Sequence, residues 1–248
     1  MFDFHLHPAR LPHPKALQEA LGIADYGFVA IACEPWEWEA VAAMDASNKA
    51  FGVHPMVASQ VSEDDFKKLE SYLNTDPTAS VGECGLDRRY PGYGENGTQE
   101  AVFIRQVELA RDLRRDLQIH CVGDYGRIVA LLKAAHYPPK GPTQDAANNK
   151  TRASDDANSV PRPVFHRFGG DAGIVRAALP MGAIFSLHAD SFKKKSTLAA
   201  LPLIPAESVQ FETDADETTF AECSVEQIVQ SLKERWLATK SLWDNLKV

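Results

Sequence analysis

The amino-acid sequence predicts an α/β protein folded as a (β/α)8 barrel. Short segments of strand composition alternate with longer amphipathic segments, which is the pattern of a barrel of parallel strands. With 248 residues, of which 44% are hydrophobic, the chain can bury a large core. This length would also fit two small domains, but we expect residues 1–248 to form a single domain.

The first strand is expected at the start of the chain. With the two-residue period of a strand, Asp3, His5 and His7 lie on one face, and the apolar residues between them lie on the other. Two histidines spaced in this way can bind one divalent metal ion, although the same pair also occurs at plain polar strand ends. The pair therefore indicates a metal site only if the rest of the chain supplies further ligands.

The other strands are predicted where short apolar runs stop at glycine, proline or polar residues. Residues 28–33 are apolar throughout, as in a strand that is buried on both faces. The predicted strands after the first cover residues 28–33, 50–54, 79–83, 117–120, 164–166, 182–186 and 208–212.

Helices are predicted between most of these strands. Pro14 suits the first turn of a helix over 14–21, and Ser62 suits the N-cap of a helix that ends at Leu73. Residues 98–115 form the longest amphipathic segment, with apolar side chains close to helical spacing. Two further helices are expected at 36–48 and 128–136.

Residues 137–163 interrupt this alternation. The segment is rich in proline, asparagine, aspartate, lysine, serine and threonine, and its only apolar members are alanines, Val160 and Tyr137. Because it can bury little apolar area, we expect a flexible, exposed insertion between the fifth and sixth strands. A folded lid over the site is the alternative.

Composition narrows the class of protein. A formal net charge of -8 argues against a general nucleic-acid coat protein, which needs a basic surface. No apolar run is long enough to cross a bilayer, and the N-terminus lacks the apolar core of a signal peptide. The four cysteines are widely spaced, so we expect reduced thiols. These observations favour a cytoplasmic protein without a membrane partner, and they imply no obligate protein partner.

Polar side chains gather at the carboxyl ends of the predicted strands. The chain has eight histidines, and five of them end a predicted strand. In a parallel barrel these ends share one face, where active sites of this fold lie. Each residue alone is compatible with a core histidine or a solvated carboxylate, but together they indicate a site. They are His5, His7, His54, Glu83, His120, His166 and Asp214.

Six short motifs contain these residues, and they span residues 1 to about 214. In order they are Asp3-Phe4-His5-Leu6-His7, Gly52-Val53-His54-Pro55, Val81-Gly82-Glu83-Cys84-Gly85-Leu86-Asp87, Gln118-Ile119-His120, His166-Arg167-Phe168-Gly169-Gly170 and Phe211-Glu212-Thr213-Asp214. Together they resemble the motifs of the TatD-like metal-dependent hydrolases. This family consists of amidohydrolase-type (β/α)8 barrels and includes metal-dependent deoxyribonucleases.

The resemblance implies a centre of two divalent metal ions. By position, the first ion would be bound by His5, His7 and Asp214, the second by His120 and His166, and Glu83 would bridge them. Imidazole and carboxylate ligands suit zinc, which we expect in the purified protein, as well as Mg, Mn, Ni, Co or Fe. Such a centre activates a water molecule for hydrolysis, and Asp214 is the candidate base that accepts its proton.

The chain departs from the family pattern next to one expected ligand. The family usually has Ser or Thr and then Arg, a phosphate contact, after the histidine of the fifth strand, whereas this chain has Cys121-Val122-Gly123 after His120. It also has Ala215-Asp216 after Asp214, where the family usually has Ser or Ala followed by Pro. These departures leave the expected metal ligands in place and concern the substrate.

Several further residues are candidates for substrate contact. His54 can bind a phosphate or simply pack at its strand end, and His188 follows the seventh strand. One of Arg88 and Arg89 can clamp a phosphate, although both would also suit a solvated surface. Strand alternation directs Cys84 and Cys121 away from the barrel interior, so we expect neither to be a ligand.

The sequence thus predicts a metal-dependent hydrolase, and specifically a phosphodiesterase or deoxyribonuclease acting on DNA ends. Two alternatives remain open. The same metal centre would serve an amidohydrolase or a hydrolase of small phosphate esters, because loops set the substrate on a barrel. The chain would also fit a metal-binding protein without turnover.

Overall fold

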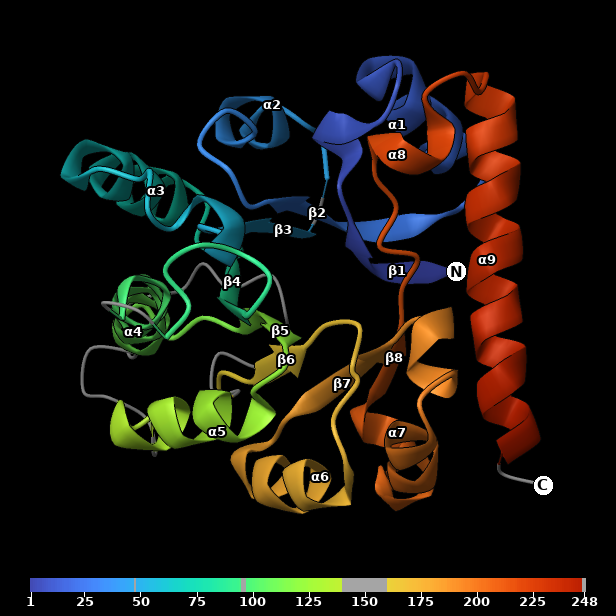
Figure 1. Ribbon diagram of the computed structural model, residues 1–248. Helices are drawn as coiled ribbons and strands as arrows, with labels where there is room; N and C mark the ends of the chain where they lie inside the picture. Colours follow the sequence, from blue (N-terminus) through green and yellow to red (C-terminus); the bar gives the residue numbers. More distant parts are fainter. Residues whose placement is uncertain (47, 95–96, 140–159, 247–248) are drawn as a thin grey trace.

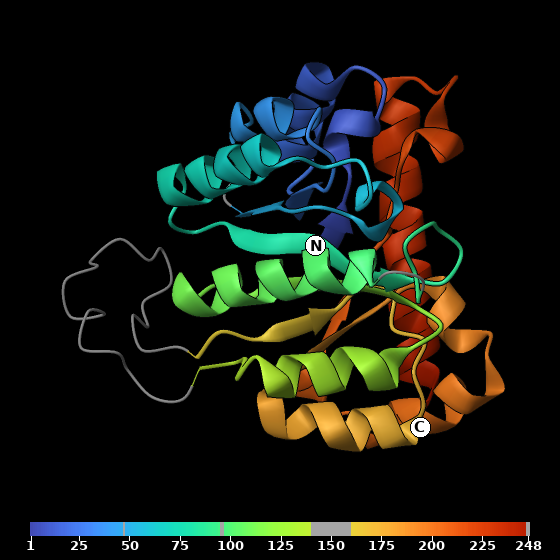
Figure 2. The same ribbon diagram turned by 60° about the vertical axis from the view of Figure 1, so that its left-hand side comes forward.

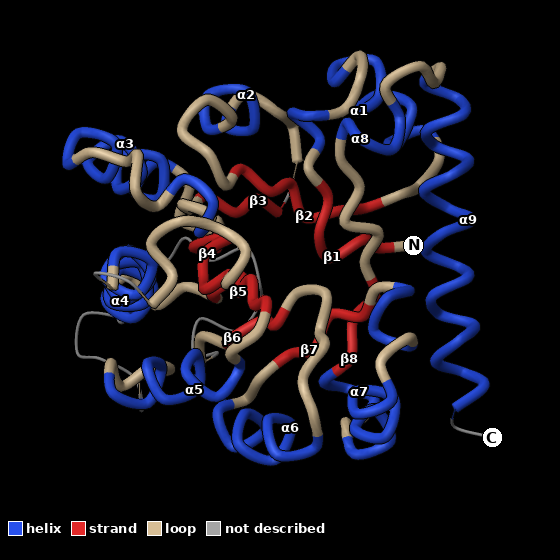
Figure 3. The backbone as a smooth tube through the Cα atoms, viewed as in Figure 1, coloured by secondary structure: helices blue, strands red, loops and turns tan. Residues whose placement is uncertain are grey.

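The computed structural model describes residues 1–46, 48–94, 97–139 and 160–246. It confirms the predicted (β/α)8 barrel, because eight strands pair in parallel and in sequence order. Figure 3 shows these strands at the centre of the molecule and the helices outside them. The strands are β1 (Phe2–Leu6), β2 (Gly27–Ala32), β3 (Asn48–Phe51), β4 (Ser80–Asp87), β5 (Leu117–Val122), β6 (Pro163–Phe165), β7 (Ile184–Leu187) and β8 (Val209–Phe211).

The helices cover the outer surface of the barrel (Figures 1 and 2). They are α1 (Pro14–Ile23), α2 (Trp38–Ala42), α3 (Glu63–Thr75), α4 (Thr98–Asp112), α5 (Tyr125–Ala134), α6 (Ala172–Ala178), α7 (Lys195–Ala200), α8 (Glu217–Phe220) and α9 (Val225–Leu246). The predicted N-cap Ser62 forms a capping box with Asp65 at the start of α3. Within the described residues, we find no helix that is both long and apolar enough to cross a membrane.

Short 3-10 helices follow several strands and helices. They are η1 (Pro8–Arg10), η2 (Pro55–Val57), η4 (Leu179–Met181), η5 (Ala189–Phe192), η6 (Leu201–Leu203) and η7 (Ala206–Ser208). Of these, η1, η2 and η5 begin within four residues of the ends of β1, β3 and β7, where the chain turns over the carboxyl face of the barrel.

The two faces of β2 separate the barrel interior from the surrounding layer. Val29, Ile31 and Cys33 form a small cluster with Ala50, whereas the alternate side chains of β2 join the main core beneath the helices. The continuously apolar sequence of β2 therefore serves two buried faces, as predicted.

The barrel closes between β1 and β8 through few backbone contacts. Leu6 forms an isolated parallel bridge with Ala215, just beyond β8. The Asp3 carboxylate reinforces this seam by accepting hydrogen bonds from the backbone N–H and the hydroxyl of Thr213, at 3.0 and 2.5 Å. The Tyr26 hydroxyl donates to the same carboxylate at 2.9 Å. A fully buried carboxyl group thus connects the first strand to the residues that follow the last one.

Helix α9 packs over the same seam. The Trp236 indole N–H donates to the Phe2 carbonyl of β1 at 2.8 Å, and its ring meets the ring of Phe211 in β8 edge to face. Figure 1 shows α9 running alongside β1 and β8. This C-terminal helix was not predicted from the sequence.

Some predicted boundaries are wrong. Helix α2 covers five residues, Trp38–Ala42, where the sequence suggested 36–48, and β3 already begins at Asn48. The Lys49 amine of β3 donates a hydrogen bond to the carbonyl oxygen of Ala42, the last residue of α2, and the buried indole of Trp38, the first residue, donates one to the Gly52 carbonyl oxygen. These contacts are tertiary, so local composition does not reveal them.

The predicted insertion at 137–163 lies largely outside the described residues, which omit 140–159. Its described ends are only partly exposed, as Val160 is, and the expectation is wrong for Tyr137 and Pro163. Tyr137 is buried in the core, and its hydroxyl donates to the carbonyl oxygens of Arg115 and Arg162 at 2.7 and 3.1 Å. Pro163 is the first residue of β6. The start and end of this segment are therefore part of the barrel.

Candidate metal centre

Glu83 lies at the centre of the predicted site. Its buried carboxylate faces histidines from two sides of the barrel. Oε2 lies 3.3 Å from His5 Nε2 and 3.6 Å from His7 Nε2. Oε1 lies 2.7 Å from His120 Nδ1 and 2.9 Å from His166 Nε2. One carboxylate thus connects two pairs of imidazoles, one pair at each oxygen.

The local backbone of β4 brings these side chains together. The register between β4 and β5 shifts between Gly82 and Cys84, so Glu83 lies at an irregularity in the ladder. Gly85 has a φ of +150°, and a Cβ there would lie 1.9 Å from the His120 carbonyl oxygen. Only glycine allows β4 to approach β5 this closely. The glycines around Glu83 therefore set the distance between Glu83 and His120.

Asp214 completes the group from the end of β8. Its Oδ1 lies 3.6 Å from His7 Nε2, and its Oδ2 accepts a hydrogen bond from Arg167 Nη1 at 2.7 Å. Its backbone N–H donates to the His5 carbonyl oxygen at 3.0 Å. These contacts fix the carboxylate beside the two histidines of β1.

The donor set fits divalent metal ions. Three groups of side chains offer ligand atoms that lie within 4.8 Å of one another: His5, His7 and Glu83; His54, Glu83 and His120; and His5, His166 and Glu212. In the described part of the chain, Nδ1 of His5 and Nδ1 of His7 are buried without a hydrogen-bond partner. The nitrogens that face Glu83 are Nε2 of both rings, and imidazole nitrogens beside carboxylate oxygens are ligands that suit a divalent ion.

The charges of the group depend on one another. Burial by itself would raise the pKa of Glu83, but the neighbouring His166, His5 and His54 lower it well below its usual value. Burial would lower the pKa of His166, but Glu83, Glu212 and Asp214 raise it well above its usual value. At neutral pH the Glu83 carboxylate is therefore ionised and the His166 ring carries a proton, which an ion bound to that ring would displace.

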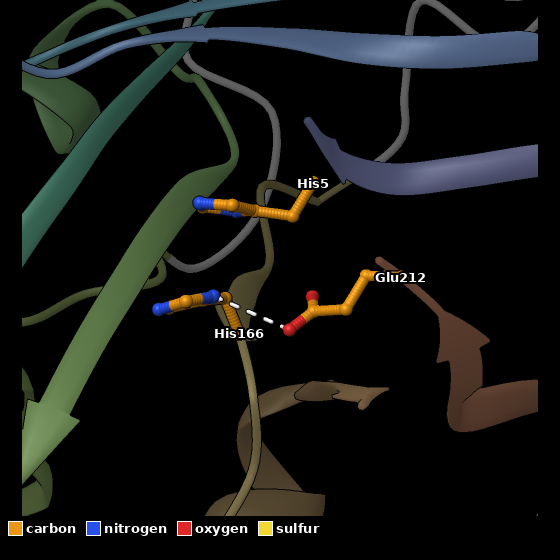
Figure 4. A group of neighbouring side chains, drawn as sticks. All are labelled: His5, His166 and Glu212. Atoms are coloured by element: carbon orange, nitrogen blue, oxygen red, sulfur yellow. Dashed lines mark ion pairs between the residues drawn. The ribbon is translucent and has the colours of Figure 1, made fainter. Parts of the chain in front are cut away.

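Glu212 and Asp87 are functional candidates that the sequence analysis did not assign. Glu212 Oε1 lies 3.3 Å from His166 Nδ1, and Figure 4 shows this carboxylate facing His166. The ring of His5 stacks on the ring of His166. Asp87 Oδ2 lies 2.9 Å from His120 Nε2. Carboxylates that hold the far nitrogen of a histidine fix its orientation toward a metal. Both residues lie inside quoted motifs, which was the available signal.

His54 adopts a single favoured tautomer. Its Nδ1 accepts a hydrogen bond from the Met56 N–H at 3.1 Å, so the proton of the neutral ring is on Nε2. That Nε2 lies 3.7 Å from Glu83 Oε1. Burial lowers the pKa of His54 to about 3, so the ring is neutral at physiological pH. His54 therefore presents a hydrogen-bond donor, rather than a lone pair, to the site.

Glu83 also lines a cavity of about 300 Å³. Its lining includes three arginines, Arg10, Arg89 and Arg167, together with Tyr90 and Val122. The predicted contacts Arg88 and His188 are absent from the described residues that line this cavity. Arg88 lies over Gly123, and the His188 Nδ1 accepts a hydrogen bond from the Asp190 N–H.

The cysteines are separate from the ligand groups. Cys84 and Cys121 are buried and free, and burial raises the pKa of the Cys121 thiol to about 12. The metal-binding groups found among the described side chains contain no cysteine.

A larger cavity of about 950 Å³, lined by Arg111, Lys133 and Met181, contains none of the predicted ligands.

Comparison with known proteins identifies the family. The family model described as TatD related DNase matches residues 2–241. The chain belongs to the TatD family. Two TatD relatives, from Edwardsiella piscicida and Pantoea ananatis, are named 3'-5' ssDNA/RNA exonuclease TatD and are 29% and 30% identical over 167 residues. That match covers 66% of this chain and 56% of each relative, so the chain spans just over half of their length.

Solved TatD structures share the fold. The TatD homologue YJJV from Escherichia coli superposes with a TM-score of 0.67 at 18% identity, covering 95% of both chains. A TatD family hydrolase from Entamoeba histolytica gives a TM-score of 0.59 at 17% identity, covering 84% of this chain and 64% of that one. At this identity the likeness concerns the barrel alone.

Proposed function

We propose that this protein is a metal-dependent phosphodiesterase that hydrolyses nucleic-acid strands at their ends, with DNA as a substrate. The observation that carries the proposal is the position of Glu83, whose two carboxylate oxygens each face at least two histidines. Two ions can share such a carboxylate as a bridging ligand. The names of the TatD relatives support nucleic acid as the substrate class.

The proposed ligands divide between the two oxygens of Glu83. We assign His5, His7 and Asp214 to the first ion, His120 and His166 to the second, and Glu83 to both. When bound, divalent ions would supply Lewis acidity toward the phosphate and lower the pKa of a water molecule toward neutrality. Zinc suits this imidazole and carboxylate set, as do Mn, Ni, Co, Fe and Mg to differing degrees.

Two residues would act on the substrate directly. Asp214 would accept the proton of the attacking water, and Arg167 holds its Oδ2 so that Oδ1 faces His7. His54 would donate its Nε2–H to a phosphate oxygen, since its other nitrogen is engaged by Met56. This donor stays available from acid to alkaline pH because the ring carries its proton on Nε2 whenever it is neutral.

The proposal includes a cytoplasmic location for the enzyme. The four cysteines are free, and three of them are buried. Free thiols are typical of reducing compartments, which supports a cytoplasmic enzyme.

The experiment pairs elemental analysis with hydrolysis assays on protein purified without chelator. We expect about two metal ions per chain, and turnover of bis(p-nitrophenyl) phosphate and of single-stranded oligonucleotides that chelation removes and metal restores. His5→Ala and Glu83→Ala should lose metal and turnover together, whereas the exposed Glu108→Ala on α4 is the matched control.

Three results would contradict the proposal. Normal metal content in both variants would show that the ligands are elsewhere. Bound metal with turnover of amides or small phosphate monoesters only would identify another hydrolase on the same centre. Bound metal with no turnover of any substrate would identify a metal-binding protein.

A further inference from the structure

Arg89 differs from the other arginines of the cavity in how much of its charge is offset. Arg10 and Arg167 each contact two carboxylates, which are those of Glu34 and Glu37 for Arg10, and of Asp190 and Asp214 for Arg167. Arg89 contacts one carboxylate among the described residues, that of Asp87. The side chain of Arg89 is 59% exposed, whereas that of Arg10 is 11% exposed. Arg89 is therefore the least neutralised cation at this cavity.

Asp87 fixes one edge of the Arg89 guanidinium and leaves the other edge unused. Nε donates to both carboxylate oxygens at 3.0 and 3.1 Å, and Nη2 donates to Oδ2 at 2.6 Å. The Arg89 backbone N–H also donates to Asp87 Oδ1 at 2.8 Å. Nη1 donates no hydrogen bond to a described residue. A guanidinium held on one edge presents its remaining donors in a fixed direction, which suits a phosphate.

The same Asp87 connects Arg89 to the metal centre. Its Oδ2 also contacts His120 Nε2 at 2.9 Å, and the Nδ1 of that ring faces Glu83. One carboxylate and one imidazole therefore separate the Arg89 guanidinium from Glu83. This separation places the cation beside the centre and not on it.

The loop after β4 also packs against the end of β5. At the end of β5 this chain has Val122 and Gly123, and Arg88 packs directly over Gly123. Val122 lines the cavity as an apolar residue. A cation that reaches the cavity near this strand end comes from the neighbouring loop, from Arg89.

We propose that Arg89 binds the phosphate adjacent to the reacting one in a nucleic-acid strand. This inference rests on the proposed function, and it names the group that distinguishes a strand from a substrate with a single phosphate. Tyr90 supports the guanidinium, which lies 5.6 Å from the centre of its ring.

The first test compares two substrates in the metal-loaded enzyme. Arg89→Ala should raise KM for a short oligothymidylate about tenfold, the effect of a lost hydrogen bond to a charged group. Its kcat, and both constants for bis(p-nitrophenyl) phosphate, should stay near the wild-type values because that ester has only the reacting phosphate. Arg88→Ala removes the same charge one residue away, and it should leave the oligothymidylate KM unchanged.

The second test measures binding without turnover. Fluorescence anisotropy of labelled oligothymidylate is recorded with chelator-treated protein over a range of salt concentrations. Loss of one phosphate contact lowers the slope of log K against log salt by about 0.7 for a single strand. We expect this decrease in Arg89→Ala and an unchanged slope in Arg88→Ala.

The outcomes separate the inference from the function on which it rests. A wild-type enzyme that binds oligothymidylate without cleaving it overturns the proposed function, and the salt slopes still decide the role of Arg89. Cleavage with equal KM and equal slope in wild type and Arg89→Ala overturns the inference alone. Equal losses on both substrates, with reduced metal content, would show that Arg89 only supports Asp87 and His120. Failure of the wild type to bind or cleave overturns both.

Discussion

Replacement of Glu212 by glutamine tests how far the site depends on the residues behind its ligands. Glu212 is fully buried, and its Oε1 lies 3.3 Å from His166 Nδ1 and accepts the Arg167 N–H. At that separation, the attraction of the carboxylate for a charged imidazole is about 5 kcal/mol at an effective dielectric constant of about 20, which sets an upper limit. Loss of such a supporting carboxylate weakens metal binding about 10- to 100-fold, or roughly 1.4 to 2.7 kcal/mol.

The assay is competition for zinc with a chromophoric chelator, at several pH values. We expect Glu212→Gln to bind the same number of metal ions per chain as the wild type. At alkaline pH it should bind the less tightly held ion about 10- to 100-fold more weakly than the wild type does. Glu212 also raises the pKa of His166, so a proton competes with metal more strongly in the wild type. The difference between the proteins should therefore narrow as the pH falls.

The exposed Glu207→Gln serves as the control for this experiment. Affinities within about twofold of each other at alkaline pH would refute the supporting role of Glu212, because a loss that small is well below the expected range. If the variant bound one metal ion fewer than the wild type, Glu212 would itself be a metal ligand, and its supporting role would again be refuted.

Two further predictions concern the free energy of unfolding of the metal-free protein, measured by urea titration. Burial lowers the pKa of His54 to about 3, below the value of about 6.5 in the unfolded chain. The contribution of His54 to the free energy of unfolding is therefore fully present above pH 6.5. It decreases by about 1.4 kcal/mol per pH unit as the pH falls toward 3. In His54→Asn, which keeps an acceptor for the Met56 N–H, stability should fall less steeply below pH 6.5; parallel curves would contradict this. Tyr26→Phe removes a buried donor to Asp3 and should cost about 1 to 3 kcal/mol, whereas a loss below about 0.5 kcal/mol would show that Asp3 does not need it.

The barrel was predictable because its main signals are local. Continuous apolar runs such as residues 28–33 mark strands that are buried on both faces, and Ser62 marks a helix start by its own hydrogen bonds. The boundaries around α2 were not predictable, because the hydrogen-bond partners of its first and last residues come from other parts of the fold. The same holds for Tyr137, whose burial depends on carbonyl groups from two distant segments.

The candidate site shows the same division. Strand-end position brought His5 and Glu83 into one group from sequence alone, since parallel strands place their carboxyl ends together. Position along a strand does not say which of two neighbouring arginines reaches the cavity, and here it is Arg89 that does so while Arg88 packs on Gly123. It also does not distinguish a buried glutamate that supports a ligand, such as Glu212, from one at the surface.

The seam between β1 and β8 gives the metal centre a mechanical consequence. His5 and His7 lie on one side of this junction and Asp214 on the other, and the described backbone hydrogen bonds that span it are few, such as the one from the Asp214 N–H to the His5 carbonyl oxygen. An ion bound to all three would act as a non-covalent cross-link between the two ends of the barrel and would close a loop of most of the chain. Cross-links that close long loops remove the most entropy from the unfolded chain. The catalytic ion would then also stabilise the contact between the first and last strands, and its release would let these two strands separate before the other strands do.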